Sequence, residues 1–527
     1  MWRAPRSPGA SAEAGRLFSP AAVALLVAAL TLVRLAFATV VPITEDEAYY
    51  RLWALHPAFG HLDHPPMVGW WIAAGFAAAG DGLLGIRLPS IFAAALGSLA
   101  LWRTAFLLAG RDAAVAGRTV VWFNATLLVG AGSLIATPDQ PATLFWGLTL
   151  WALAEGAFGR RNGDGAAFAC GWWLAVGLFA GLGLLSKYST LFLGAGILLW
   201  LVADRRRWGA FREPRLWIGG ALAMALFAPV VAWNAAHGWA SFAKQFGRAA
   251  GEGLSFVYLP ELLAGQIGLV GPLMVPFLAI GVVAAIGAMR SGGVHGLATG
   301  NPPASAAALL LLTSAPFLAY LLVHALHDRV QANWPAPLYP AIAILAATAA
   351  AGPAVAARPW LGALRGGVAP VGIGVGLVAL SLAAMPLPGL ARLDPLARFR
   401  GWDDLAADVD AARRQAGAAW IATAGYGPTA MLAYFLRDVP VVQLDERLRY
   451  VNAPPPDPAL LSEPALFVVD ARARKTDALL ARFAEHTELG SVERWAAGAP
   501  VATFRLFGLA APRGEPLGDG DPAPPGS

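Results

Sequence analysis

Charged residues are scarce in this chain. Asp, Glu, Lys and Arg make up only 13% of its 527 residues and 57% are hydrophobic, whereas an ordinary soluble chain is about one quarter charged. A soluble fold could not bury that much apolar surface. Several runs approach the roughly 18 to 20 apolar residues that a membrane-spanning helix needs, namely residues 20–41, 304–323 and 366–384. The composition therefore predicts an integral membrane protein that crosses the bilayer many times.

Cysteine and lysine are nearly absent. Cys170 is the only cysteine, so no internal disulfide can form and cysteine usage does not reveal the compartment. The only lysines are Lys187, Lys244 and Lys475. The net charge of +5 is carried by short basic clusters between apolar runs. That arrangement argues against a nucleic-acid partner and is better explained by orientation in a membrane.

Apolar runs separated by polar breakers predict an all-α polytopic membrane domain over residues 1–386, with about eleven spans. Their approximate limits are 20–41, 87–108, 113–133, 139–157, 166–185, 189–203, 215–233, 264–288, 305–323, 338–352 and 367–386. The sixth and tenth lie near the lower length limit. We interpret the first as a retained span, because it is too long for a signal peptide and no cleavage site is convincing.

Arginine distribution predicts the orientation of these spans. With a cytoplasmic amino terminus, the cytoplasmic side carries Arg111, Arg118, Arg160, Arg161, Arg205 to Arg207, Arg212, Arg215, Arg290, Arg358 and Arg365. The opposite side carries fewer, namely Arg51, Arg87, Lys187, Lys244, Arg248 and Arg329. This asymmetry fits the positive-inside rule. We therefore expect a multi-pass protein of a bacterial inner (plasma) membrane, and an odd number of spans places everything after residue 386 in the periplasm or outside the cell.

The C-terminal part has a different character, since charge rises and long apolar runs stop. Helical patterns cover 402–415, 428–436 and 475–484, and strand-like runs cover 419–423, 439–443, 465–469 and 501–507. These patterns predict a small external α/β domain over residues 387–510. Residues 511–527 are rich in Pro and Gly and are expected to be disordered.

Six polar clusters fall on the predicted outer face. They are Thr44 to Tyr50, His61 to Pro66, Thr137 to Asp139, Ser186 to Tyr188, Trp233 to Trp239, and the run from His324 to Trp334 that contains His327, Asp328, Arg329, Gln331 and Asn333. Any one cluster is ordinary in a solvated loop. Six clusters on one face are harder to explain in this way, because the limits of the spans follow from the apolar runs alone. Those limits do not require the polar clusters to share a face.

These residue types suit the transfer of a sugar from a lipid phosphate. That chemistry needs a carboxylate to take the acceptor proton, donors for the leaving phosphate, and an apolar groove for the lipid chain. Asp46 is the natural base. The predicted phosphate ligands are Lys187, Arg329 and His64, and the predicted substrate contacts are Tyr49, Tyr50, His61, Asp63, Asn234, His237 and Asn333. Lys187 could equally be a structural lysine whose side chain extends to the membrane interface without binding substrate.

The same loop also carries residue types that bind metal ions. His61, Asp63 and His64, together with Asp46 or Glu47, could supply nitrogen and oxygen ligands. Their spacing matches no established site. No cofactor is therefore assigned, and a divalent metal is left open.

The segments DEAYY, HLDHPPMVGWW, RLPS, ATPD, LLSKYS, WNAAHGW, Gly265-Gln266 and QANWPAPLYP follow one another in this order, with RFRGWDDLA and GYGPTAMLAYFL in the tail. Together they resemble the bacterial members of the protein O-mannosyltransferase superfamily, the family 39 glycosyltransferases. A more distant similarity is to the aminoarabinose transferases that modify lipid A. Motifs combined in one order are far more specific than any one of them alone. The resemblance covers most of the predicted membrane domain.

The resemblance implies a type C glycosyltransferase fold with its catalytic aspartate in the first external loop, residues 42–86. The family's proposed base carries over onto Asp46, beside Glu47, and the aspartate that opens the fourth span carries over onto Asp139. The predicted catalytic residues are therefore Asp46, Glu47 and Asp139. The family's loop segment carries over onto residues 63–66. That stretch reads Asp63-His64-Pro65 where the aminoarabinose transferases have glutamate-lysine-proline, so their phosphate and metal contacts do not carry over.

The expected activity is inverting transfer from a polyprenyl-phosphate-linked sugar, within membrane lipid, to an envelope glycolipid, polysaccharide or protein. A transporter or lipid flippase is the alternative, because many spans with intramembrane charges also describe that class. Transporters place polar sites near the midplane, whereas these clusters lie at one membrane end. A non-catalytic assembly factor would have no need of Asp46 and Asp139.

The topology can be tested directly. Because the arginine bias and the odd span count both place the C-terminal part outside, a reporter that is active only in the cytoplasm should be inactive when fused after Gly389. The same reporter fused before residue 20 should be active. Activity of the Gly389 fusion would contradict the predicted orientation.

Overall fold

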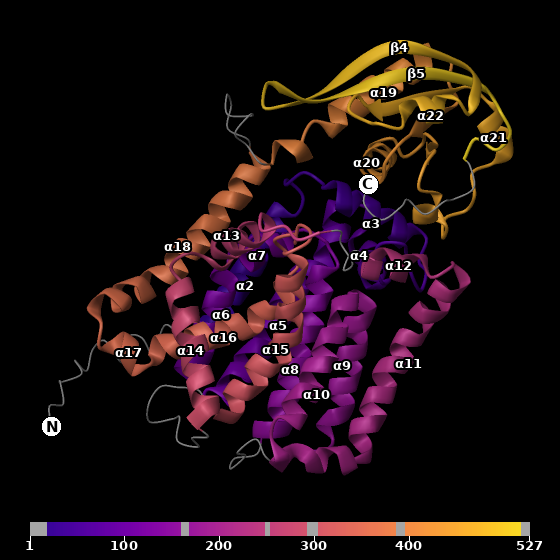
Figure 1. Ribbon diagram of the computed structural model, residues 1–527. Helices are drawn as coiled ribbons and strands as arrows, with labels where there is room; N and C mark the ends of the chain where they lie inside the picture. Colours follow the sequence, from indigo (N-terminus) through magenta and orange to yellow (C-terminus); the bar gives the residue numbers. More distant parts are fainter. Residues whose placement is uncertain (1–17, 160–167, 248–252, 292–303, 386–395, 518–527) are drawn as a thin grey trace, which may run out of the picture. The chain divides into compact units, whose positions relative to one another are not determined.

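The computed structural model describes residues 18–159, 168–247, 253–291, 304–385 and 396–517, and most of these are helical (Figure 1). The chain forms two compact units. The first contains the residues up to Ala38, Arg87–His237 and Phe246–Ala379, and the second contains Thr39–Ile86, Gly238–Gln245 and the residues from Leu380 onward. The second unit therefore combines the predicted first external loop with the C-terminal part of the chain.

The helices of the first unit overlap every predicted span. They are α2 (Pro20–Phe37), α5 (Leu83–Leu108), α6 (Ala113–Ala125), α7 (Leu127–Gly130), α8 (Asp139–Phe158), α9 (Trp172–Ser186), α10 (Leu191–Val202), α11 (Pro214–Ala236), α13 (Tyr258–Val270), α14 (Val275–Ser291), α15 (Ala304–His324), α16 (Tyr339–Ala351), α17 (Pro353–Ala356) and α18 (Pro359–Ala384). Among the described residues, five helices are long and apolar enough to cross a membrane, or up to eight if each of three bent pairs is one span. The total of eleven stays a prediction.

The predicted span at 264–288 consists of two helices. α13 and α14 meet at an angle of 106°. The chain turns at Gly271, whose φ of +97° lies in the region that favours glycine, and Pro272 follows. The apolar run concealed this break, because hydropathy alone does not register a turn inside an apolar segment.

Arg34 explains how a second broken helix is accommodated. α6 and the short helical stretch at Leu127–Leu134 meet at 74°, which leaves carbonyl groups without a helical partner. The Arg34 side chain, only 1% exposed, donates from Nε to the Gly130 carbonyl at 3.3 Å and from Nη2 to Val129 at 3.1 Å and to Asn124 Oδ1 at 3.0 Å. A cation on α2 thus satisfies backbone groups that lipid could not satisfy.

Close packing of small residues joins α9 and α11, which lie side by side (Figure 1). A Cβ atom on Gly177 would lie 2.0 Å from the Gly219 carbonyl oxygen, and one on Gly219 would lie 2.3 Å from the Trp173 carbonyl oxygen. Between helices surrounded by lipid, such backbone approach replaces the hydrophobic driving force available in water. The crossing therefore depends on glycine at both positions.

The second unit contains a five-stranded sheet and several helices. The helices are α3 (Glu45–Leu55), α4 (Met67–Ala79), α12 (Ala240–Gly247), α19 (Trp402–Gln415), α20 (Tyr426–Phe435), α21 (Pro458–Ser462) and α22 (Thr476–Leu480). The strands are β1 (Trp420–Thr423), β2 (Val441–Gln443), β3 (Ala465–Asp470), β4 (Phe483–Ala496) and β5 (Ala499–Pro512), in the order β2-β1-β3-β5-β4. β1 pairs in parallel with β2 and β3, whereas β5 runs antiparallel to β3 and β4.

Two sequence predictions for this sheet need correction. The helical pattern at 475–484 ends at Leu480, and the long strand β4 follows it from Phe483. β4 forms a long hairpin with β5 (Figure 1) and is exposed along most of its length, so its sequence lacks the alternation that marks a half-buried strand. β5 continues to Pro512, inside the stretch expected to be disordered, and residues 518–527 of that stretch lie outside the described residues.

The glycine crossing predicts a sharp difference between two neighbouring positions. Gly219→Ala should lower the melting temperature of the detergent-purified protein by several degrees, because its Cβ would overlap the Trp173 carbonyl oxygen. Gly220→Ala has open space around its Cβ, and alanine is the better helix former by up to about 1 kcal/mol. That control should be neutral or slightly stabilising. Equal melting temperatures for the two variants would refute the packing.

Candidate functional site

Helix α3 presents three consecutive acidic residues at its first turn. Thr44 caps the helix by accepting from the Glu47 N–H at 3.2 Å, and Glu47 Oε2 accepts from the Thr44 N–H at 3.1 Å. This reciprocal pair is a capping box, and Glu47 is fully buried within it. The structure therefore gives Glu47, predicted from sequence as a catalytic residue, a role in starting the helix.

Asp46 is half-buried on the same turn. Its Oδ1 atom accepts a hydrogen bond of 3.0 Å from the Tyr426 hydroxyl of α20, and among the described residues none donates to Oδ2. Burial raises the pKa of the Asp46 carboxyl, and the Tyr426 hydrogen bond opposes that rise. Asp46 is thus a carboxylate with one oxygen held by a hydrogen bond and the other without a donor among the described residues.

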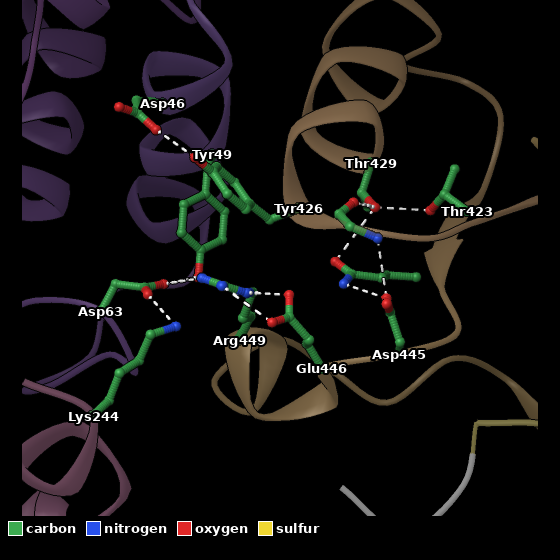
Figure 2. Close-up of polar contacts among 12 residues, drawn as sticks. Asp46, Tyr49, Asp63, Lys244, Thr423, Tyr426, Thr429, Asp445, Glu446 and Arg449 are labelled. Atoms are coloured by element: carbon green, nitrogen blue, oxygen red, sulfur yellow. Dashed lines mark hydrogen bonds and ion pairs between the residues drawn. The ribbon is translucent and has the colours of Figure 1, made fainter. Parts of the chain in front are cut away.

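Asp63, in the loop after α3, is the centre of a second group of contacts (Figure 2). Lys244 Nζ lies 2.8 Å from Oδ1, while Arg449 and the Tyr49 hydroxyl both reach Oδ2, the latter at 2.9 Å. Burial alone would raise the pKa of Asp63, but the charges of Arg449 and Lys244 hold it well below the usual range. Asp63 therefore stays ionised and compensated, unlike Asp46.

His61 packs against an aromatic residue of α3. Its ring stacks on Trp53 with centroids 4.0 Å apart, and its Nδ1 is 3.0 Å from the amide nitrogen of Asn452. Burial lowers the pKa of His61 to about 3, so the ring is neutral. Nδ1 accepts from Asn452, and the predicted contact of His61 with substrate stays a prediction.

The first unit holds its own polar cluster, which joins three predicted residues. Asp139 opens α8, and its Oδ1 lies 2.6 Å from Lys187 Nζ at the end of α9. Asn333 donates to Asp139 Oδ2 at 2.6 Å, and the Lys187 ammonium lies 5.8 Å from the ring centre of Trp334. Lys187 and Asp139 are only 12% and 7% exposed, so this is a buried ion pair with polar neighbours.

The remaining predicted residues are more scattered. Tyr50 is buried beside Trp53, with His64 near its ring at 6.4 Å. Arg329 forms an exposed ion pair of 2.5 Å with Glu261. Asn234 is buried and donates to the Val230 carbonyl within α11, and His237 stacks on Trp233 at the end of that helix. Their proposed substrate contacts stay predictions.

A metal centre has no obvious ligand set here. Within the part of the chain that the structure describes, no group of three or more His, Cys, Asp or Glu side chains is arranged to hold a metal ion. Of the loop residues considered as ligands, His61 is hydrogen-bonded to Asn452. Asp63 forms ion pairs with Arg449 and Lys244.

Sequence reasoning missed Tyr426 and Arg449, and it counted Lys244 only as a loop charge. Arg449 lies in the short 3₁₀ turn η9 (Arg447–Tyr450) and is also paired with Glu446 at 2.7 Å. The only available signal was the GYGPTAMLAYFL segment, which marks Tyr426 by its flanking glycines. Nothing local in the sequence connects residue 449 to residue 63.

Comparisons with known proteins cover much of the chain. Residues 63–233 match the family described as dolichyl-phosphate-mannose-protein mannosyltransferase. Over 415 residues the chain is 27% identical to the lipid A galacturonosyltransferase RgtD of Rhizobium johnstonii, a match that covers 75% of this chain and 77% of the relative. Asp63, Asp139 and Lys187 lie inside the family match, whereas Asp46 precedes it.

The fold has solved counterparts. The crystal structure of ArnT from Cupriavidus metallidurans bound to undecaprenyl phosphate superposes with a TM-score of 0.62 at 16% identity, over 94% of this chain and 99% of that one. The apo structure of the same protein gives a TM-score of 0.60 at 16% identity, over 92% and 97%. At this identity the likeness shows a shared fold.

Proposed function

We propose that this chain, a multi-pass membrane glycosyltransferase related to the protein O-mannosyltransferase superfamily, takes its sugar from a polyprenyl-phosphate carrier at the outer face of the membrane. This identity sets aside the transporter and assembly-factor alternatives. One solved structure with the same fold is of a protein bound to undecaprenyl phosphate, which supports a donor of this class. The predicted topology supports the outer face.

The acceptor we propose is an envelope glycolipid of the lipid A type. The curated relative is named for galacturonosyl transfer to lipid A and matches three quarters of this chain. A lipid acceptor and a lipid-linked donor would both arrive from the bilayer. Both points favour a glycolipid over a polysaccharide or a protein, the other two acceptors that the sequence allowed.

Asp46 is the proposed general base, and its environment carries the proposal. An acceptor hydroxyl is a poor nucleophile until a positioned carboxylate removes its proton. Burial raises the pKa of Asp46 toward the working range of a base, and Oδ2 is available to the acceptor while Tyr426 holds Oδ1. Attack opposite the leaving phosphate would invert the anomeric carbon.

Lys187 is the proposed ligand of the donor phosphate. An ammonium has three N–H donors, and the contact with Asp139 uses one of them. The Asp139 carboxylate and the Trp334 ring hold the ammonium in place, so a phosphate could be bound without a change of side-chain position. Asn333, which donates to the same Asp139, limits the movement of that carboxylate.

Replacing Asp46 tests the proposed base. Asp46→Asn keeps the size of the side chain and should reduce sugar transfer by about 10² to 10⁴, the usual contribution of general-base catalysis. Donor binding should be intact. The measurement is transfer of radiolabelled sugar from a polyprenyl-phosphate-sugar to lipid A by the purified protein, with the anomeric configuration of the product read by NMR.

Two neighbouring acids provide matched controls. Glu45→Gln and Glu47→Gln remove a carboxylate from the same helical turn without touching Asp46, and both should cost much less activity. Near-normal turnover by Asp46→Asn would exclude Asp46 as the base and direct attention to Asp139.

Lys187 can be tested without confusing binding with folding. Lys187→Met leaves Asp139 buried without its ion pair, which should destabilise the protein by about 3 to 5 kcal/mol. The same substitution removes the proposed contact with the donor phosphate. It should therefore raise the donor KM about tenfold or more, because charge-assisted hydrogen bonds to phosphate contribute about 1.5 to 3 kcal/mol. Adding Asp139→Asn should restore most of the melting temperature. The donor KM of the double variant should stay high compared with that of Asp139→Asn alone. A KM equal to that control would limit Lys187 to a structural role.

A further inference from the structure

Gly425, Tyr426 and Gly427 stand at the start of helix α20, and the backbone conformation of Gly425 favours glycine. Gly425 has a φ of +78°, in the region that favours glycine, and its N–H donates to Asp445 Oδ1 at 3.1 Å. The Glu45 side chain reaches Gly427, since a Cβ atom built on that glycine would lie 2.6 Å from Glu45 Oε2. The start of α20 therefore lies against the first turn of α3, with Tyr426 beside that contact.

At that point the Tyr426 hydroxyl donates to Asp46 Oδ1 at 3.0 Å, as Figure 2 shows. We infer that Tyr426 is a positioning residue that fixes the Asp46 carboxylate, so that Oδ2 is presented to the acceptor hydroxyl. The inference rests on the proposed function, because it takes Asp46 to be the general base. It gives the C-terminal part of the chain a direct share in catalysis, 380 residues away in the sequence.

Tyr426 is itself held in place. The Arg449 guanidinium lies 4.8 Å from the centre of its ring, a cation–π distance, and the ring of Tyr49 lies 5.1 Å away. Arg449 is in turn fixed by ion pairs with Asp63 and Glu446. A phenol packed between these groups has little freedom to turn, so its hydroxyl can define the orientation of the carboxylate it contacts.

The hydrogen bond also sets the basicity of Asp46. Burial raises the pKa of Asp46, the Tyr426 hydroxyl lowers it, and the charges of Asp63 and Glu47 raise it further. Two other charged groups surround the site, namely Arg398, which lowers the pKa of Asp46, and Glu45, whose own pKa is raised by burial. Burial and the Asp46 charge raise the pKa of Tyr426 itself, so the phenol stays protonated and remains a donor.

Tyr426→Phe removes this one hydroxyl and leaves the ring in place. Without the donor, the pKa of Asp46 rises, and the base is protonated over a wider acidic range. The acid limb of the kcat/KM profile for sugar transfer should therefore move upward by about one pH unit. On the alkaline plateau kcat should fall several-fold while the donor KM stays unchanged, because orientation of the base is lost and donor binding is not.

A control from the same helix separates this role from a general effect on folding. Tyr434→Phe, about two turns further along α20, should keep the wild-type acid limb. An acid limb that stays at the wild-type pH in Tyr426→Phe, or a loss that is uniform at every pH, overturns the inference. If instead Asp46→Asn keeps its turnover, the proposed base has failed and not the positioning alone, so the two failures can be told apart.

Discussion

The carboxylate of Asp63 joins three stretches of the second unit that lie far apart in the sequence. Lys244 approaches from α12, Arg449 from the η9 turn, and Tyr49 from α3, while the Gln245 side chain donates to the backbone carbonyl of Asp63. A buried carboxylate left without such donors would cost several kcal/mol. The position of each stretch therefore depends on the other two. The surroundings of Asp46, on the same helix as Tyr49, depend on all three.

Asp46 and Asp63 show how one loop can hold two carboxylates with different properties. Asp63 has two cations and a phenol, so its pKa is held low and it is unsuited to exchanging a proton near neutrality. Asp46 has one neutral donor and is half-buried, so its pKa is raised. Environments that push the pKa values of two acids apart commonly separate a structural from a catalytic carboxylate. The contrast favours Asp46 as the carboxylate that accepts the proton and Asp63 as a structural carboxylate.

Much of the fold follows from local pattern. The amphipathic repeat with acids in its first turn and arginines in its last marks Trp402–Gln415, and α19 has those limits. The strand β4 was missed because its side chains are mostly exposed. Among the candidate residues, Asp46 was predicted from the polar first loop, and Asp139 and Lys187 from polar clusters at the ends of predicted spans. Tyr426 and Arg449 were not, because their roles arise from contacts across about 380 residues that no spacing rule describes.

The three consecutive acidic side chains of α3 make different contacts because a helix turns about 100° per residue. Glu47 faces back toward the amino end and closes the cap with Thr44. The Glu45 side chain reaches Gly427 at the start of α20. Asp46, between them, accepts a hydrogen bond from the Tyr426 hydroxyl. The helical period thus selects a single carboxylate for orientation by the C-terminal part, and shifting the cap by one residue would present a different acid to the same tyrosine.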